Sequence, residues 1–175
     1  MTHDSNASGS ERLWRQSPSP HVSASPIDHL MDRISPERRS ENMRAIRGRD
    51  TRPERIVRSL LHTLGYRYRT HLARLPGRPD VVFTRRRKAV FVHGCFWHRH
   101  PGCTKAYTPK SRQDFWQRKF EGNVARDEAA IRALENDGWS VLIVWECEAA
   151  NPDRLAHTLT NFLGPPIYSA REIND

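Results

Sequence analysis

The sequence predicts an α/β domain with a small mixed β-sheet flanked by helices. Apolar side chains recur at three- and four-residue steps through 56–64, as on one face of a helix. The run 139–145 is almost wholly apolar, as expected for a strand buried on both faces. Two short apolar stretches, 80–83 and 89–92, flank a run of basic residues, which predicts a β-hairpin with a basic turn. Strands mixed with helices in this order are typical of an α/β fold.

Four helices are expected around these strands. A short basic helix begins at Ser35, where a hydroxyl N-cap is followed by proline. A second helix covers 51–64 and ends before a glycine. A long helix is expected from its N-cap at Ser111 to about Asp137, and a last one covers roughly 152–163.

The chain is expected to hold one domain. Its 175 residues suit a single hydrophobic core. Residues 1–34 contain many Ser, Pro and His and no sustained apolar period, so we expect a disordered N-terminal extension. The domain then covers 35–165, and 166–175 form a C-terminal tail.

The charge of the chain points to a polyanionic partner. Lys and Arg number 29 against 20 Asp and Glu, which gives a formal charge of +9. Each basic side chain that meets a phosphate releases a condensed counterion, so such an excess favours nucleic acid binding. Charge alone does not separate nucleic acid from an anionic membrane surface. However, no apolar run reaches the roughly 18 residues of a transmembrane helix, and the N-terminus lacks a signal peptide core. A soluble intracellular protein without membrane contact is expected.

The cysteines predict a metal site. Cys95, His100 and Cys103 follow a C-x4-H-x2-C spacing, short enough for one loop to surround a tetrahedral ion. Cys147 comes just after the apolar strand, where the sheet could deliver a fourth ligand. A closed set of three cysteines and one histidine is typical of structural zinc, whose binding energy becomes folding energy. The alternative is that these are ordinary buried thiols.

Candidates for catalysis lie at the ends of the predicted hairpin. Asp80 begins the first strand, and Val92 and His93 end the second, so a carboxylate, a carbonyl and an imidazole would lie near each other. Mg²⁺ prefers oxygen ligands and keeps several waters, so Asp80, the carbonyl and a phosphate would suffice. His98 could act as a general base, because histidine titrates close to neutral pH. Asp127 on the long helix could orient that imidazole.

Each of these residues also has a purely structural interpretation. Asp80 could simply follow a proline turn, and His93 and His98 could be hydrogen-bonded loop histidines. Asp127 could be a solvated helix residue. For Glu54 the structural interpretation is strongest, because it is the third residue of a Thr-x-x-Glu capping box. A functional role for this carboxylate could coexist with the cap.

Five short blocks follow one another in the chain. They are 42–46 (NMRAI), 75–80 (LPGRPD), 93–98 (HGCFWH), 123–127 (NVARD) and 141–147 (VLIVWEC). In this order they resemble the signature blocks of the very short patch repair (Vsr) family of DNA mismatch endonucleases. The resemblance covers about residues 36–163 and does not include 1–34. Five ordered blocks are far more specific than any single motif.

The resemblance implies a fold related to type II restriction endonucleases, without their usual Glu-x-Lys on the second strand. Asp80 would be the Mg²⁺ ligand, joined by the backbone carbonyl of Val92. This position is Val where some members have Thr, and a carbonyl ligand tolerates that change. The family also holds a structural zinc with ligands that match Cys95, His100, Cys103 and Cys147.

The resemblance also assigns the remaining polar residues. His98 would be the base that activates water, supported by Asp127. His93 and Glu54 would organise metal-bound waters and the phosphate.

Contacts with DNA are expected from large apolar or aromatic side chains and from polar side chains on the long helix. The residues are Met43, Phe96, Trp97, Trp116, Lys119 and Asn123. Exposed aromatic side chains beside basic residues suit insertion between base pairs, and a T:G wobble pair costs less to unstack than a matched pair. The alternative is that these aromatic residues belong to the core. By resemblance, Met43 would reach the DNA from the minor-groove side, and Lys119 and Asn123 would contact the mismatch or its flanks.

The resulting hypothesis is a strand-specific DNA endonuclease. It would use Mg²⁺ to nick double-stranded DNA 5′ to the thymine of a T:G mismatch that arises when 5-methylcytosine deaminates. A cytosine-5 DNA methyltransferase and mismatch-repair proteins are the expected functional partners of a monomer acting at the nucleoid in the cytoplasm. Two alternatives remain: a non-catalytic, zinc-braced protein that binds distorted duplex, and a nuclease of the same fold with relaxed specificity.

Overall fold

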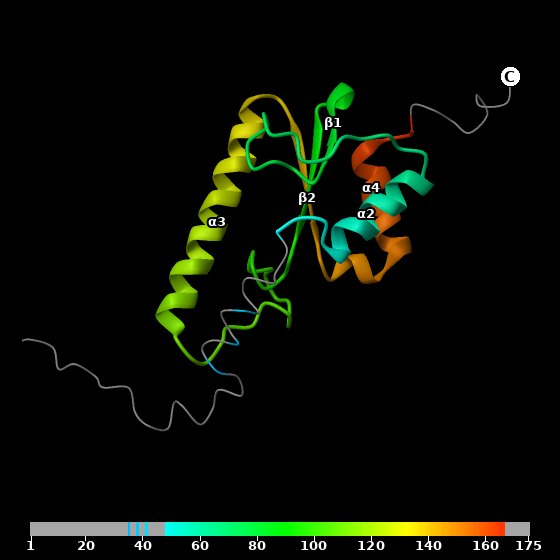
Figure 1. Cartoon of the computed structure of the whole chain (residues 1–175). Helices are drawn as coiled ribbons and strands as arrows, with labels where there is room; N and C mark the ends of the chain where they lie inside the picture. Colours follow the sequence, from blue (N-terminus) through cyan, green and yellow to red (C-terminus); the bar gives the residue numbers. More distant parts are fainter. Residues whose placement is uncertain (1–34, 36–37, 39–40, 42–47, 167–175) are drawn as a thin grey trace, which may run out of the picture. The chain divides into compact units, whose positions relative to one another are not determined.

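A mixed three-stranded sheet lies at the centre of the domain (Figure 1). The structure is a computed structural model that describes residues 35, 38, 41 and 48–166. Strand β1 (Val81–Phe83) pairs antiparallel with β2 (Lys88–His93), which pairs parallel with β3 (Ser140–Trp145). The order β1-β2-β3 confirms the predicted small mixed sheet, whereas its relation to restriction endonucleases stays a prediction.

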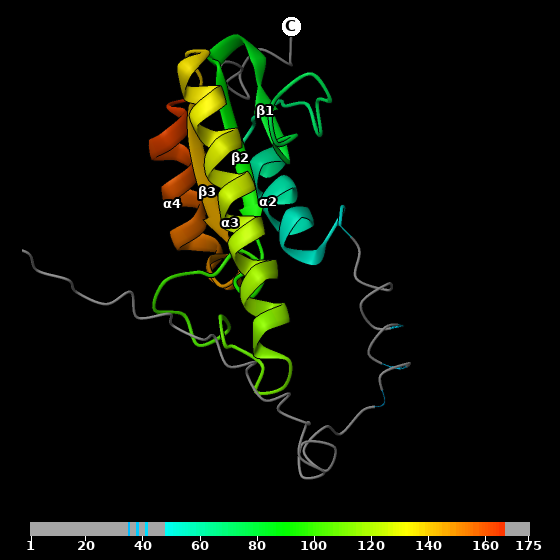
Figure 2. The ribbon, with the colours of Figure 1, turned by 90° about the vertical axis from the view of Figure 1, so that its left-hand side faces the viewer.

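Helices cover both faces of this sheet. Helix α3 (Gln113–Asn136) lies along one face, and α2 (Arg52–Thr63) and α4 (Pro152–Leu163) cover the other (Figures 1 and 2). Successive strand residues point to opposite faces, so β2 serves both layers. Val90 packs with the cluster under α2 and α4, and Phe91 packs with the cluster that includes Leu134 of α3.

Helix α2 forms for reasons visible in its sequence. The side chain of Thr51 accepts from the N–H of Glu54, and the Glu54 carboxylate accepts from the N–H of Thr51, which completes the capping box. Val57 and Leu61 are fully buried on its apolar face. Gly65 adopts a left-handed φ of 82° just after the helix, as a C-terminal glycine commonly does. The cap orients the N-terminus of α2, where the candidate site lies.

Three predicted features differ from the structure. The basic turn of the hairpin is a short 3₁₀ helix, Thr84–Arg86, and Lys88 already belongs to β2. The N-cap of the long helix is Arg112 and not Ser111, because the chain turns sharply there with a left-handed φ of 52°. The apolar run 139–145 was predicted to be a strand buried on both faces. It forms β3, which lies at the edge of the sheet, and Val144 is its one fully buried residue.

Several predictions fall partly or wholly outside the described residues. Residues 1–34, most of the tail 166–175, and Met43 lie there, so the domain bounds stay a prediction. Of the short basic helix, the structure describes residues 35, 38 and 41; Arg38 and Glu41 are helical, and the Ser35 hydroxyl accepts from the N–H of Arg38 at 3.2 Å, in agreement with the predicted cap. None of the helices in the described part of the chain has the length and apolar character needed to cross a membrane.

Candidate active site and metal-ligand cluster

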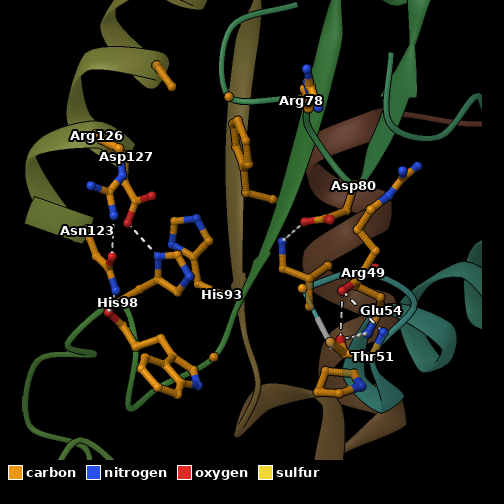
Figure 3. Close-up of a pocket in the computed structure, with 18 of the residues that line it drawn as sticks. Arg49, Thr51, Glu54, Arg78, Asp80, His93, His98, Asn123, Arg126 and Asp127 are labelled. Carbon is orange, nitrogen blue, oxygen red and sulfur yellow. Dashed lines mark hydrogen bonds and ion pairs between the residues drawn. The ribbon is translucent and has the colours of Figure 1, made fainter. Parts of the chain in front are cut away.

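A hollow opens between α3, the C-terminal end of β2 and the N-terminus of α2 (Figure 3). We call the side with His98, Asn123 and Asp127 the α3 wall. The side with Glu54, His71 and Asp80 is the carboxylate wall. All five predicted catalytic residues line this hollow, so the fold brings together groups that are far apart in the chain.

Asp80 stands immediately before β1 and is tied to β2. Its Oδ2 accepts from the N–H of Val92 at 2.7 Å. The N–H and C=O of a strand residue leave the chain on the same side, so the carbonyl of Val92 also points toward Asp80 and away from β3. Burial raises the pKa of Asp80 to about 6, against the opposing effect of the hydrogen bond from Val92. A carboxylate that is costly to ionise, next to a carbonyl, offers two oxygen ligands to a cation.

His98 and Asp127 form a pair on the α3 wall. The Nδ1 of His98 lies 2.5 Å from Oδ2 of Asp127, and the loop carrying His98 is held by its N–H bond to the carbonyl of Gly94. A carboxylate at Nδ1 accepts the proton of that nitrogen, so the lone pair of a neutral imidazole is on Nε2. The His98 side chain is 27% exposed, so Nε2 can take a proton from a bound molecule.

His93 packs directly against the imidazole ring of His98. It ends β2, is 5% exposed and stacks on His98 with ring centres 4.0 Å apart. Trp145 packs edge-on against His93, with ring centres 5.5 Å apart. Burial lowers the pKa of His93 to about 4, and the neighbouring His98 adds to the effect. His93 is therefore neutral near pH 7 and keeps its partner oriented.

Glu54 combines the cap with a place in the hollow. Its carboxylate accepts from the N–H of Asp50 at 2.9 Å and from the hydroxyl of Thr51 at 2.8 Å. The residue is 4% exposed, and Figure 3 shows it beside Asp80 on the carboxylate wall. The structure confirms the capping role, and a role in catalysis stays a prediction.

A second cluster lies beyond the end of β2. Ligand atoms of Cys95, His100, Cys103 and Cys147 all lie within 4.8 Å of one another. The Nδ1 of His100 is 3.6 Å from the Cys95 sulfur and 3.3 Å from the Cys147 sulfur. These separations suit four ligands around a tetrahedral ion. Burial raises the pKa of Cys95 to about 12, so its thiolate needs a cation nearby. The predicted set therefore comes together and can hold a metal ion.

The aromatic residues predicted to meet DNA pack around Phe96. Its ring centre lies 4.9 Å from Trp97 and 5.4 Å from Trp116. Trp116 is 8% exposed and stacks on Phe120, so it belongs to the core as the alternative interpretation proposed. Phe96 and Trp97 are half-buried in the loop after β2. Contacts of the three with DNA stay a prediction.

The polar DNA-contact candidates lie on α3. Lys119 is exposed and Asn123 is half-buried, and both line the hollow. The Nδ2 of Asn123 donates to the carbonyl of Trp97 at 2.9 Å, which connects the helix to the loop. Arg126 donates to Oδ1 of Asn123 at 2.5 Å.

His71 and Arg126 also line the hollow, and neither was predicted from the sequence. Arg126 precedes Asp127, so its place on α3 could have been inferred from the helix. His71 lies in a loop without a periodic pattern, and no signal in the sequence places it beside Asp80.

Two oxygen atoms that could hold a cation, a histidine held by an aspartate, and a strongly basic chain are features that suit an enzyme hydrolysing nucleic acid. Comparison with known proteins gives the family. The family model described as DNA mismatch endonuclease Vsr matches residues 31–105. The chain belongs to this family and is a DNA endonuclease.

Relatives support this assignment over most of the domain. The type II nicking enzyme V.XorIIP of Xanthomonas oryzae pv. oryzae is 52% identical over 136 residues, which cover 78% of this chain and 99% of the relative. The DNA mismatch endonuclease Vsr of Escherichia coli is 47% identical over 117 residues, covering 67% and 74%. The type II nicking enzyme V.NaeI of Lentzea aerocolonigenes is 45% identical over 130 residues, covering 68% and 77%.

Proposed function

We propose that this endonuclease uses Mg²⁺ to nick DNA 5′ to the thymine of a T:G mismatch that arises from deamination of 5-methylcytosine. The nick would begin very short patch repair. The observation that carries the proposal is the hollow itself, where Asp80 with the Val92 carbonyl faces the His98–Asp127 pair. Membership of a family of mismatch endonucleases supports the choice of substrate.

Asp80 and the carbonyl of Val92 would hold the metal ion. Both are oxygen donors, and the buried carboxylate with its raised pKa gains most from a nearby positive charge. When bound, Mg²⁺ polarises the phosphate and stabilises the departing oxygen. Asp80 has one oxygen tied to the Val92 N–H, which leaves Oδ1 as the oxygen for a cation.

His98 would act as the general base. Its Nε2 takes a proton from the water that attacks phosphorus, while Asp127 accepts from Nδ1 and stabilises the resulting imidazolium. The bond from phosphorus to the 3′ oxygen breaks, so the thymine keeps a 5′-phosphate and the other end becomes a 3′-hydroxyl. His93, stacked on His98 and neutral, keeps the base in place, and Glu54 would organise waters on the carboxylate wall.

Recognition would depend on insertion of aromatic side chains. Phe96 and Trp97 lie on the loop next to the hollow, so insertion between base pairs would bring the phosphate to His98. A T:G pair yields to this insertion at lower cost than a matched pair. Lys119 and Asn123 line the same hollow and would contact the mismatch or its flanks. Trp116 would have to leave its packing to reach DNA, and Met43 is assigned by resemblance alone.

We propose that the cysteine–histidine cluster holds a structural zinc ion. Three ligands lie on the loop 95–103, and Cys147 anchors that loop to the segment after β3. The same loop carries Phe96 and Trp97, which would insert between base pairs, and His98, the proposed base. The ion would therefore hold these three side chains in place relative to one another. All four ligand positions would come from the protein, which fits a structural role.

The partners follow from this reaction. The substrate would be double-stranded DNA, and a cytosine-5 DNA methyltransferase would create the bases that deaminate to T:G. Mismatch-repair proteins would act with the enzyme, which we expect to be a cytoplasmic monomer at the nucleoid.

The decisive experiment is a nicking assay on matched labelled duplexes. One duplex holds a T:G pair in a methyltransferase-type context and the other the corresponding C:G pair, each with Mg²⁺ or EDTA. The proposal expects Mg²⁺-dependent nicking beside the thymine of the first duplex, lost in Asp80→Ala. Binding that prefers the mismatch without any cut would favour a non-catalytic protein for distorted duplex. Cutting of both duplexes would favour a nuclease with relaxed specificity.

A further inference from the structure

His71 is placed beside Asp80 by backbone pairing. Arg69 and Val82 exchange two backbone hydrogen bonds, at 2.9 and 2.8 Å, and the N–H of His71 donates to the carbonyl of Pro79 at 3.2 Å. The segment 69–71 therefore runs antiparallel to the segment 79–82, which includes the start of β1. This pairing holds the backbone of His71 opposite the residue that precedes Asp80.

The His71 side chain faces the carboxylates of both Asp80 and Glu54. Its Nδ1 lies 3.9 Å from Oδ1 of Asp80, and its Nε2 lies 3.9 Å from Oε2 of Glu54. The same Nε2 is 4.0 Å from Oδ1 of Asp50. These separations are just beyond hydrogen-bond length, as is common for catalytic groups without substrate. His71 therefore lies between Asp80, which precedes β1, and Glu54, which belongs to α2.

His71 carries two features that work against stability. Its side chain is 10% exposed, yet Nε2 is buried without a hydrogen-bond partner among the described residues. Its backbone has a left-handed φ of 48°, which is unfavourable for a residue with a Cβ. The unpaired buried nitrogen distinguishes His71 from the other described residues with a positive φ, and such a group is common where a side chain serves a site rather than packing.

A second metal ion is one possible explanation, because Asp50, Glu54 and His71 lie within ligand distance of one another. However, Nη2 of Arg58 is already 2.7 Å from Oδ1 of Asp50 and 3.7 Å from Oε2 of Glu54. This guanidinium supplies the positive charge that a metal ion would bring. The geometry therefore favours a direct role for the imidazole.

We propose that His71 is a positioning residue that orients the Asp80 carboxylate for metal binding. The N–H of Val92 holds Oδ2, and Nδ1 of His71 faces Oδ1, the oxygen left for the cation. A hydrogen bond from Nδ1 to Oδ1, formed when the 3.9 Å gap closes on metal binding, would fix the plane of the carboxylate together with the bond at Oδ2. Nε2 of the same ring faces Oε2 of Glu54 at 3.9 Å, so the ring lies between the two carboxylates. The inference rests on the proposed function, because it concerns the metal ligand of that reaction.

The test compares replacements that keep different halves of the ring. His71→Asn keeps a nitrogen near the Nδ1 position and tolerates a left-handed φ. His71→Gln keeps a nitrogen near the Nε2 position, and His71→Ala removes both. His62→Ala, at an exposed position on α2, is the matched control for loss of a histidine. The readouts are Mn²⁺ binding to the full-length protein by electron paramagnetic resonance, the Mg²⁺ concentration for half-maximal nicking, and the thermal midpoint.

His71→Ala is expected to weaken Mn²⁺ binding and raise the Mg²⁺ requirement by about ten-fold, as loss of a residue that orients a metal ligand does. His71→Asn should recover most of this loss, His71→Gln should not, and His71→Asn should keep the wild-type thermal midpoint. Wild-type metal binding in both His71→Ala and His71→Gln would overturn the inference, as would equal losses in His71→Asn and His71→Gln. Absence of nicking by the wild type would refute the proposed function instead, and the Mn²⁺ comparison would still decide the role of His71.

Discussion

The two walls of the hollow differ in how closely their side chains contact one another. On the α3 wall, His98 and Asp127 are 2.5 Å apart and His93 stacks on the imidazole. On the carboxylate wall, His71 stands 3.9 Å from both Asp80 and Glu54. His98, the proposed base, is therefore held in place by direct contacts, whereas the groups of the carboxylate wall stand just beyond hydrogen-bond distance of one another. This difference predicts that changes on one wall affect metal binding and changes on the other affect proton transfer.

The largest effect is expected from Asp80→Asn. Nicking should fall by about 10³-fold or more, because the metal-derived stabilisation of several kcal/mol is lost. Mn²⁺ binding should be lost as well, as measured by electron paramagnetic resonance. Asp80 has a folded-state pKa above its ordinary 3.8, so its ionisation costs folding free energy, and this cost is complete above about pH 6. The free energy of unfolding at pH 7 should therefore not decrease in urea titrations, and normal metal binding by this variant would contradict the assignment.

His98→Ala is expected to act on the other wall. Loss of a general base should lower the nicking rate by about 10²-fold, measured in single turnover at saturating Mg²⁺. The Mg²⁺ concentration for half-maximal rate should stay at the wild-type value, because His98 does not contact the Asp80 carboxylate. A matched decrease in Mg²⁺ affinity would show that the two walls do not act independently.

Cys103→Ser tests whether the cysteine–histidine cluster holds the α3 wall. Loss of one ligand should lower the zinc content measured by inductively coupled plasma mass spectrometry, lower the thermal midpoint, and slow nicking by about ten-fold. Exposed Thr104→Ala, on the same loop, is the control. A variant with full activity and no zinc would show that the loop needs no metal to orient His98.

The smallest effect is a change in pH dependence. Because burial raises the pKa of Asp80 to about 6, nicking at low Mg²⁺ should rise as pH increases through about 6. A cation binds the ionised carboxylate, so higher Mg²⁺ should move the midpoint of this rise to lower pH. Single-turnover rates from pH 5 to 8 at two Mg²⁺ concentrations measure the shift. A midpoint that does not depend on Mg²⁺ would show that another group controls it.

Local patterns in the sequence correctly predicted the local structure. The Thr51–Glu54 capping box and the last helix at 152–163 formed where expected, because caps and apolar periods act within one or two helical turns. Ser111 failed as a cap because the left-handed turn at Arg112 depends on how the preceding loop folds. The packing of Trp116 against Phe120 could not be inferred from the sequence, because it depends on how the loop folds onto α3, and its contact with DNA stays a prediction.

The sequence by itself determined the fold class and the family, and it named most of the groups that meet in the hollow and in the cysteine–histidine cluster, because these depend on spacing along the chain and on ordered motifs. Only the tertiary structure decided which groups touch: His98 meets Asp127 from 29 positions away, and Cys147 reaches His100 from 47. His71 shows the limit most clearly, since no local pattern marks it. Its place beside Asp80 comes from long-range pairing of two backbone segments, which no local spacing encodes.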